Sequence, residues 1–323
     1  MIEKGRYLNL SSSISIVNYI LLLAIISLFW IYKRHGFDLT DEAFYALSST
    51  QPENIVSNLT SFGYLTNYVI RFFNCDFHTT RIFGLFLILG TWSLVCLKVI
   101  RDTKENISKK ELAVQFPCLV LPVLLFYWDG IYSLNYNLYA VCGLNLILYG
   151  LSCSEDIRLG FKGILIGSFG VFVCLMSKFT VIPCLLGLCC IFSLVKKSKL
   201  ELKYITYIIA VSPFFFVLHF FFSQDNLFLF LERHNHAFNN LHLLKSEHLI
   251  FINDVSILDT FYRILTFASP AYTFIVFVII VNFIIVHKYR HLKTLNIPVA
   301  LLLSLSLLIV YQSHNPNRWS LNY

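Results

Sequence analysis

Only 13% of the 323 residues are charged, whereas 57% are hydrophobic, and the formal net charge is +7. A soluble domain carries roughly 25% charged residues, so this composition excludes a soluble globular protein and predicts a membrane protein. The positive charge does not indicate nucleic-acid binding, because the basic residues are divided among short segments between apolar runs.

The first apolar run, Ile14–Tyr32, predicts a transmembrane helix. Its length is close to the roughly 20 residues that cross a bilayer. A cleavable signal peptide fits less well, since the run is too long and no small-x-small cleavage site ends it. We expect the short segment before it, which carries Lys4 and Arg6, to lie in the cytoplasm.

Eight further apolar runs follow, and the chain is therefore expected to be an all-α polytopic membrane protein with about nine helices. The runs are Ile82–Val99, Leu112–Tyr127, Leu138–Leu151, Ile164–Ser177, Val181–Val195, Tyr204–Phe222, Pro270–Val286 and Ile297–Tyr311.

Alternate segments between these runs are basic. They are Lys98–Lys110, Ser152–Gly163, Lys196–Lys203 and Lys288–Lys293. With a cytoplasmic N-terminus and nine helices, all four fall on the cytoplasmic side, as the positive-inside rule requires. The opposite segments, which include residues 33–81 and 223–269, are then extracytoplasmic.

The first outer segment, residues 33–81, contains the most distinctive polar stretch of the chain, Phe37–Ala46. Three of the 18 acidic residues, Asp38, Asp41 and Glu42, fall within five positions there, close to a membrane surface. A carboxylate that is partly removed from water and flanked by another carboxylate can act as a general base. The plainer alternative is that the three acids solvate a loop.

The remainder of this outer segment predicts short helices. Pro52 followed by Glu53 is typical of a helix start. Apolar residues then recur every three to four positions from Ile55 to Phe73, with an interruption around Gly63. Such an amphipathic segment either lies flat on the membrane surface or packs on other helices as a lid, and the pattern favours neither.

Lys178 is the most informative basic residue, because it lies between two apolar runs. An unpaired ammonium there costs roughly 2–3 kcal/mol unless it reaches the interface or finds a partner. A phosphate group is one such partner. A lysine that extends from a helix end to the interface is an equally weighted alternative.

The outer segment 223–269 contains Arg233 and several histidines, namely His234, His236, His242 and His248. A His-x-His pattern with two more imidazoles nearby can indicate zinc, but no Cys or closely spaced carboxylate completes a ligand set. We therefore prefer a solvated or substrate-facing loop.

Several of these stretches resemble the GT-C glycosyltransferases, and in particular the bacterial protein-mannosyl and aminoarabinose transferase-like branch, often described as family 39-like. Asp38–Tyr45 is similar to the family's Asp-Leu-(Ser/Thr)-Asp-Glu-Gly-(Phe/Tyr)-Tyr and departs from it only at Ala43. Arg81 stands at the mouth of the second span, where the family often has Arg. Tyr136-Asn137 resembles part of a Pro-Ser-Tyr-Asn stretch, and Lys178-Phe179-Thr180 resembles the Lys-x-Thr that closes the fifth helix.

The resemblance implies a GT-C-type helix bundle with amphipathic surface helices in the first outer loop. It covers about residues 14–200, so residues 1–200 are expected to form the catalytic module and residues 201–323 to add further helices. It also implies Asp41 as the base, with Glu42 positioning it or binding the acceptor. The residues expected to bind substrate are Asp38, Lys178, Arg81, Tyr136 and Asn137.

The implied reaction moves a sugar from a polyprenyl-phosphate-linked donor to a glycan, lipid or protein acceptor, on the extracytoplasmic side of a bacterial inner (plasma) membrane. A divalent cation is left open as a cofactor, with Asp38, Asp41 and Glu42 as ligands. The alternative function is a non-enzymatic transporter or flippase of lipid-linked sugars. A transporter is expected to show inverted repeats and polar groups near mid-membrane. The sequence shows no clear repeat, and its distinctive polar groups gather at the outer ends of helices, which favours the enzyme.

Overall fold

The computed structural model describes residues 16, 19–20, 22–31, 41–55, 60–103, 134–153, 160–178, 199–223 and 225–239. Every regular element within these ranges is a helix, and none of these residues forms a strand. The predicted all-α class is therefore confirmed for the described part of the chain.

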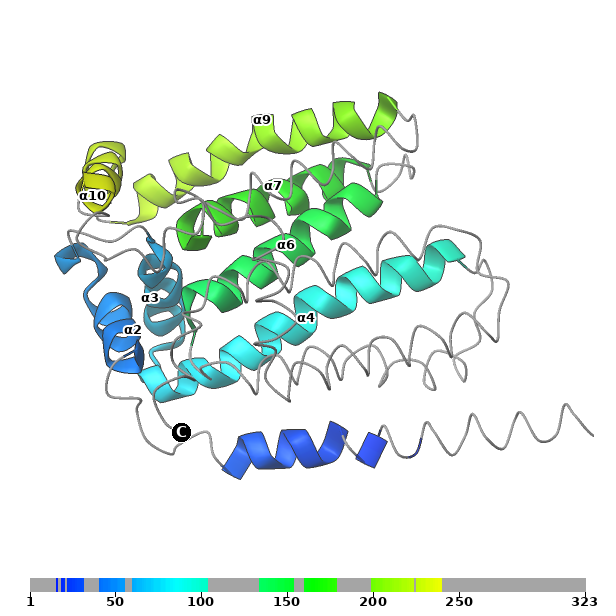
Figure 1. The fold of residues 1–323 in the computed structure, drawn as a ribbon, viewed down its shortest axis with the longest axis horizontal. Helices are drawn as coiled ribbons and strands as arrows, with labels where there is room; N and C mark the ends of the chain where they lie inside the picture. Colours follow the sequence, from blue (N-terminus) through cyan, green and yellow to red (C-terminus); the bar gives the residue numbers. More distant parts are fainter. Residues whose placement is uncertain are drawn as a thin grey trace, which may run out of the picture.

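Four long helices run side by side in Figure 1. They are α4 (Phe77–Thr103), α6 (Tyr136–Ser152), α7 (Gly160–Lys178) and α9 (Lys199–Phe222). Three segments within them are long and apolar enough to cross a membrane, and they are Thr79–Lys98, Gly160–Lys178 and Lys203–Phe222.

These three segments coincide with the second, fifth and seventh predicted spans. Helix α6 coincides with the fourth but has only 17 residues, which is the lower limit of roughly 17 for a span. The apolar helix Leu22–Ile31 falls inside the first predicted span. The remaining predicted spans lie outside the described residues, and they are Leu112–Tyr127, Val181–Val195, Pro270–Val286 and Ile297–Tyr311.

Glycines allow α6 and α7 to approach each other closely. A Cβ built at Gly150 would lie 2.7 Å from the Gly163 carbonyl oxygen, and one at Gly143 would lie 2.8 Å from the Gly170 carbonyl oxygen. Both distances are shorter than real Cβ contacts, so Gly150 and Gly143 permit a spacing that any larger residue would prevent. Close packing through small residues is a common way for helices to associate in membranes.

Cross-helix hydrogen bonds fix the neighbours of this pair. The Ser168 hydroxyl donates to the Ile208 carbonyl oxygen at 2.8 Å and joins α7 to α9. The Asn145 amide donates to the Thr91 hydroxyl at 3.3 Å and joins α6 to α4. In apolar surroundings such polar groups need partners inside the protein, because water does not reach them.

Short helices gather at one end of the long ones. Helices α2 (Asp41–Thr50), α3 (Phe62–Phe73) and α10 (Leu227–Asn239) all lie at the left in Figure 1. At this end α4 and α6 begin and α7 and α9 end. The two segments predicted to be extracytoplasmic, 33–81 and 223–269, thus contribute helices to the same end of the molecule.

Basic positions collect at the opposite end. Lys98 and Arg101 fall in the last two turns of α4, Lys162 lies in the first turn of α7, and Lys199 and Lys203 belong to the first two turns of α9. These residues belong to three of the basic segments of the sequence, whereas Arg71, Arg81, Lys178 and Arg233 lie at the end that carries the short helices. If the positive-inside rule sets the orientation, the end that carries α2, α3 and α10 faces away from the cytoplasm.

Reporter fusions test this orientation. A reporter placed after Tyr45 in α2 should behave as extracytoplasmic, and one placed after Lys199 at the start of α9 should behave as cytoplasmic. Alkaline phosphatase and a fluorescent protein are suitable reporters, because they are active on opposite sides of a bacterial inner membrane. Two fusions that report the same side would contradict the assignment.

The interruption of the apolar periodicity around Gly63 falls at the start of α3. Gly63 is the second residue of α3 and is buried. A Cβ at this position would collide with the backbone carbonyl of Ser48 in α2, so the glycine serves helix packing and does not break the helix. The predicted helix start at Pro52 corresponds to a single 3-10 turn, η1 (Pro52–Asn54).

Helix α3 packs on other helices along its first half. Its first six residues are all buried, and the Asn67 amide donates to the Ser49 carbonyl oxygen of α2 at 2.7 Å. Only its last turn, with Phe72 and Phe73, is strongly exposed. Of the two alternatives for this segment, packing against the bundle therefore describes α3, and only its last turn exposes apolar side chains.

Candidate functional site

Lys178 points into the bundle. Its ammonium donates to the Asn137 side-chain oxygen at 3.0 Å and lies 5.3 Å from the centroid of the Tyr136 ring. Both partners, the Asn137 amide and the Tyr136 ring, are neutral. The side-chain nitrogen is therefore held by an amide and an aromatic face, and neither contact supplies a negative charge.

The start of α6 is built to present Tyr136 and Asn137. Asn135 is the N-cap residue, and its side-chain oxygen accepts a hydrogen bond from the Leu138 backbone N–H at 2.9 Å. An asparagine cap satisfies one of the free N–H groups in the first helical turn. The cap fixes where α6 begins and so places Tyr136 and Asn137 opposite the end of α7.

Aromatic rings join α2 to this position. The Tyr45 ring lies 5.9 Å from the Tyr136 ring and 5.5 Å from the Phe62 ring, and Phe62 also contacts Tyr136 at 6.0 Å, in edge-to-face arrangements. Such pairs add about 0.5–1.5 kcal/mol each beyond the area they bury. Tyr45 and Phe62 were not singled out from the sequence, because only the fold shows which aromatic residues meet.

Backbone contacts complete the cluster. The Ser61 N–H, at the start of α3, donates to the Met176 carbonyl oxygen in the last turn of α7 at 2.7 Å. The C-terminal carbonyl groups of a helix lack hydrogen-bond partners within the helix itself. Here the Ser61 N–H at the start of α3 is the partner of one such carbonyl group. Helices α2, α3, α6 and α7 thus meet around Lys178.

The structure brings together some of the predicted site residues but not all of them. Lys178, Tyr136 and Asn137 are in contact. Asp41 and Glu42 form the first turn of α2, one helical turn before Tyr45. Asp38 and the side chains of Asp41 and Glu42 lie outside the described part.

Arg81 lies in the second turn of α4 at the same end of the bundle. Only 1% of it is exposed. A side chain buried to this degree does not anchor a helix at the lipid surface.

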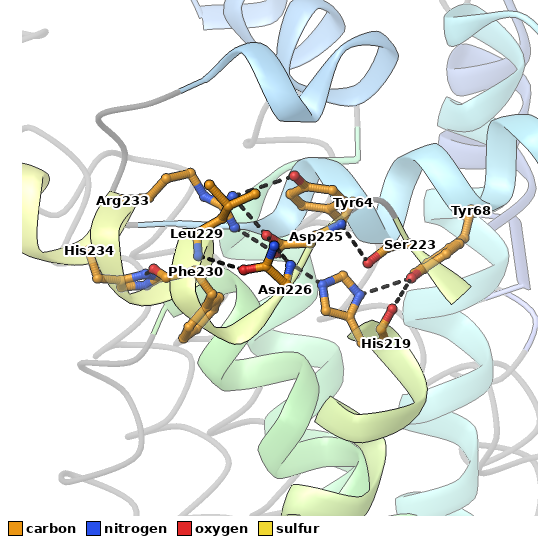
Figure 2. Close-up of polar contacts among 10 residues, drawn as sticks. All are labelled: Tyr64, Tyr68, His219, Ser223, Asp225, Asn226, Leu229, Phe230, Arg233 and His234. Atoms are coloured by element: carbon orange, nitrogen blue, oxygen red, sulfur yellow. Dashed lines mark hydrogen bonds and ion pairs between the residues drawn. The ribbon is translucent and has the colours of Figure 1, made fainter. Parts of the chain in front are cut away.

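A second polar cluster, which the sequence did not indicate, connects α9, α10 and α3 (Figure 2). Arg233 donates to both carboxylate oxygens of Asp225, at 2.9 and 2.6 Å. The His219 Nε2 lies 3.3 Å from the same carboxylate, and its Nδ1 lies 2.9 Å from the Tyr68 hydroxyl. Arg233 also lies over the Tyr64 ring, 5.2 Å from its centroid.

This ion pair is buried, with side-chain exposures of 7% for Arg233 and 0% for Asp225. Burial opposes ionisation of Asp225, but the hydrogen bonds from His219 and Arg233 and their charges outweigh it and hold the carboxyl pKa below its ordinary value. Burial, reinforced by the Asp225 charge, raises the pKa of Tyr64 to about 12. Tyr64 therefore remains neutral beside the pair.

The lowered pKa of Asp225 makes the stability of the protein depend on pH. The folded protein holds fewer protons at Asp225 than the unfolded chain does, so the stabilisation is complete above the ordinary pKa of 3.8 and is lost as the pH falls through the lower folded value. We expect the difference in unfolding free energy between the wild type and Asp225→Asn to be constant near neutral pH. The difference should shrink as the pH falls below the ordinary carboxyl pKa of 3.8. A difference that already disappears near neutral pH would contradict this assignment.

The described residues contain no group of three or more His, Cys, Asp or Glu side chains that could hold a metal ion. His234 and His236 both belong to α10, and residues two apart in a helix point in different directions. His234 instead contacts the Phe230 carbonyl oxygen through Nδ1 at 2.8 Å. This pair does not form a chelate, while His242 and His248 lie outside the described residues.

The fold is that of a polytopic α-helical membrane protein. The described residues contain three membrane-length apolar helices, a further apolar helix and short helices gathered at one end. Comparisons with models of known protein families, with curated proteins and with solved structures found no match.

Proposed function

We propose that the protein is a GT-C-type membrane glycosyltransferase that transfers a sugar from a polyprenyl-phosphate-linked donor to a glycan, lipid or protein acceptor. The observation that carries the proposal is the meeting of three segments which resemble that family. Lys178 contacts Tyr136 and Asn137, and Tyr136 contacts Tyr45 of α2, the helix that begins with Asp41 and Glu42. These segments are far apart in the sequence.

Their arrangement suits transfer from a lipid phosphate. Asp41 takes the proton from an acceptor hydroxyl as its oxygen bonds to the anomeric carbon of the sugar. The bond between that carbon and the phosphate oxygen breaks, and polyprenyl phosphate leaves with the bonding electrons. A cation near the leaving oxygen stabilises the charge that develops there.

Lys178 is the residue proposed to hold that phosphate. An ammonium in apolar surroundings is costly, and its neutral partners Asn137 and Tyr136 orient it without neutralising it. Because α7 ends at Lys178, a lipid phosphate that enters from the bilayer surface would meet the ammonium at the end of this membrane-length helix.

Asp41 and Glu42 also have a structural explanation. Acidic residues in the first turn of a helix interact favourably with its dipole, by about 0.3–1 kcal/mol each. That effect accounts for acids at the start of α2 but not for the contact between α2 and the Lys178 cluster through Tyr45. The catalytic proposal accounts for both features.

A transfer assay tests the function. The purified protein in lipid nanodiscs is supplied with radiolabelled sugars on polyprenyl phosphate and with cell-envelope extract as acceptor. We expect the label to move to the acceptor with release of polyprenyl phosphate. In sealed vesicles, movement of the intact donor across the bilayer without cleavage would instead support the alternative, a transporter of lipid-linked sugars.

A further inference from the structure

The outward surface of α10 changes character along the helix. Its first half exposes apolar side chains, with Phe228 74% exposed and Leu227 and Leu231 also largely exposed. Its second half exposes polar side chains, which are Glu232, Asn235, His236 and Asn239. A helix in water has no reason to expose its apolar residues together at one end.

The inner face of α10 is fixed, so this surface cannot turn inward. Arg233 forms the buried ion pair with Asp225, directly before the helix. Phe230, on the same side as Arg233, packs against Phe216 and Phe220 of α9 at ring distances of 5.7 and 6.1 Å. These contacts set the rotation of α10 about its axis and direct Phe228 outward.

The exposed apolar surface continues directly from α9. The membrane-length segment of that helix ends at Phe222, and its last residues, Phe221 and Phe222, are 80% and 69% exposed. After a short turn, exposed apolar side chains follow again in the chain at Leu227 and Phe228 of α10. Figure 1 shows α10 lying across the end of α9.

We infer that α10 is an interfacial helix whose partner is the lipid bilayer. Its apolar first half enters the boundary between lipid headgroups and acyl chains, while its polar second half stays among headgroups and water. Helices at that boundary bury apolar side chains about 5–10 Å deep, and in α10 the first half carries them. The ion pair Asp225–Arg233 acts as the clamp that keeps the apolar surface directed at the lipid.

The inference can be tested by fluorescence quenching of the full chain in phosphatidylcholine nanodiscs. Phe228→Trp adds a fluorophore to the apolar half of α10, and Asn235→Trp adds one to the polar half as the matched control. The emission of the unmodified protein is subtracted. One sample uses lipid brominated near the headgroup end of the acyl chains, and another uses acrylamide in water.

We expect brominated lipid to remove most of the emission added by Phe228→Trp and acrylamide to remove most of that added by Asn235→Trp. Leu231→Trp should behave like Phe228→Trp and guards against a single misfolded variant. Equal quenching of all three variants by acrylamide would overturn the inference and show a solvated helix. If neither reagent quenched Phe228→Trp, the face would be covered by protein, either another segment or a second copy, which would also overturn it.

Discussion

Replacing Asp41 by Asn should lower the rate of sugar transfer by about 100-fold or more, because the amide cannot take the proton from the acceptor hydroxyl. The change preserves size and hydrogen-bonding capacity. It removes a charge from the first turn of α2, which costs no more than about 1 kcal/mol through the helix dipole. The amount of protein in the membrane should therefore stay unchanged while transfer is lost.

Glu53→Gln is the matched control for this experiment. Glu53 is an exposed acid in the neighbouring turn η1 and has no role in the proposed reaction, so its removal should leave the rate close to that of the wild type. Full activity in Asp41→Asn would exclude Asp41 as the base. The same substitution at Glu42 and at Asp38 would then identify which carboxylate, if any, the reaction requires.

Breaking the buried pair between Asp225 and Arg233 should destabilise the protein strongly. Removing one member leaves the other charge buried, and for such pairs the cost is about 3–5 kcal/mol. We expect Arg233→Met to show a loss of this size, at the lower end of the range because His219 remains beside Asp225. The loss can be measured as the change in unfolding free energy of the detergent-solubilised protein during denaturant titration.

A double-mutant cycle separates the pair from general damage. Asp225→Asn combined with Arg233→Met removes both charges, so the double variant should be clearly more stable than the sum of the single losses predicts. Arg71→Met is the control, since Arg71 is exposed at the end of α3 and should contribute little. Single losses that add without interaction would mean that the pair does not hold α10 in place.

The long helices could be predicted because hydropathy depends on local sequence alone. The apolar runs at Ile82–Val99, Ile164–Ser177 and Tyr204–Phe222 each fall inside an observed helix. The observed helices are longer at one or both ends, since polar residues such as those at the start of α9 extend a helix beyond the apolar core. Boundaries are the least reliable part of any such prediction.

Gly63 shows where local patterns fail. A glycine lowers helix propensity by about 1 kcal/mol, and the apolar periodicity of the sequence is interrupted around this residue. In the structure the close approach of α3 to the Ser48 carbonyl outweighs that preference. Packing between segments decides such positions, and packing cannot be read from one segment by itself.

The candidate site could be predicted only in part, because one segment of sequence does not show which distant residues pack against it. Lys178 was recognisable because a lone cation between apolar runs is costly, but two destinations for its ammonium remained equally weighted. The structure adds a contact with Asn137, 41 residues earlier in the chain. Pattern reasoning alone does not pair residues across that distance.

The cluster around Asp225 was missed altogether. Asp225 and Arg233 flank the apolar start of α10, and two opposite charges so close to a predicted span are the signal that could have drawn attention to them. Their pairing requires a turn between α9 and α10 that brings the carboxylate under the guanidinium. The contribution of His219, from within a predicted span, depends on the same turn.

The most direct test of the proposed function is the affinity of the purified protein for polyprenyl phosphate, the part of the donor that every candidate sugar shares. Lys178→Met keeps an apolar stem and removes only the ammonium, whereas Lys162→Met removes an exposed lysine from the opposite end of the same helix. Lys178→Met should lose roughly 1–3 kcal/mol of binding free energy, or about 5- to 150-fold in affinity. Lys162→Met should bind like the wild type. Equal affinities for the wild type and Lys178→Met would contradict the proposal, make Lys178 a structural residue and direct the search for a phosphate site to Arg71 or Arg81.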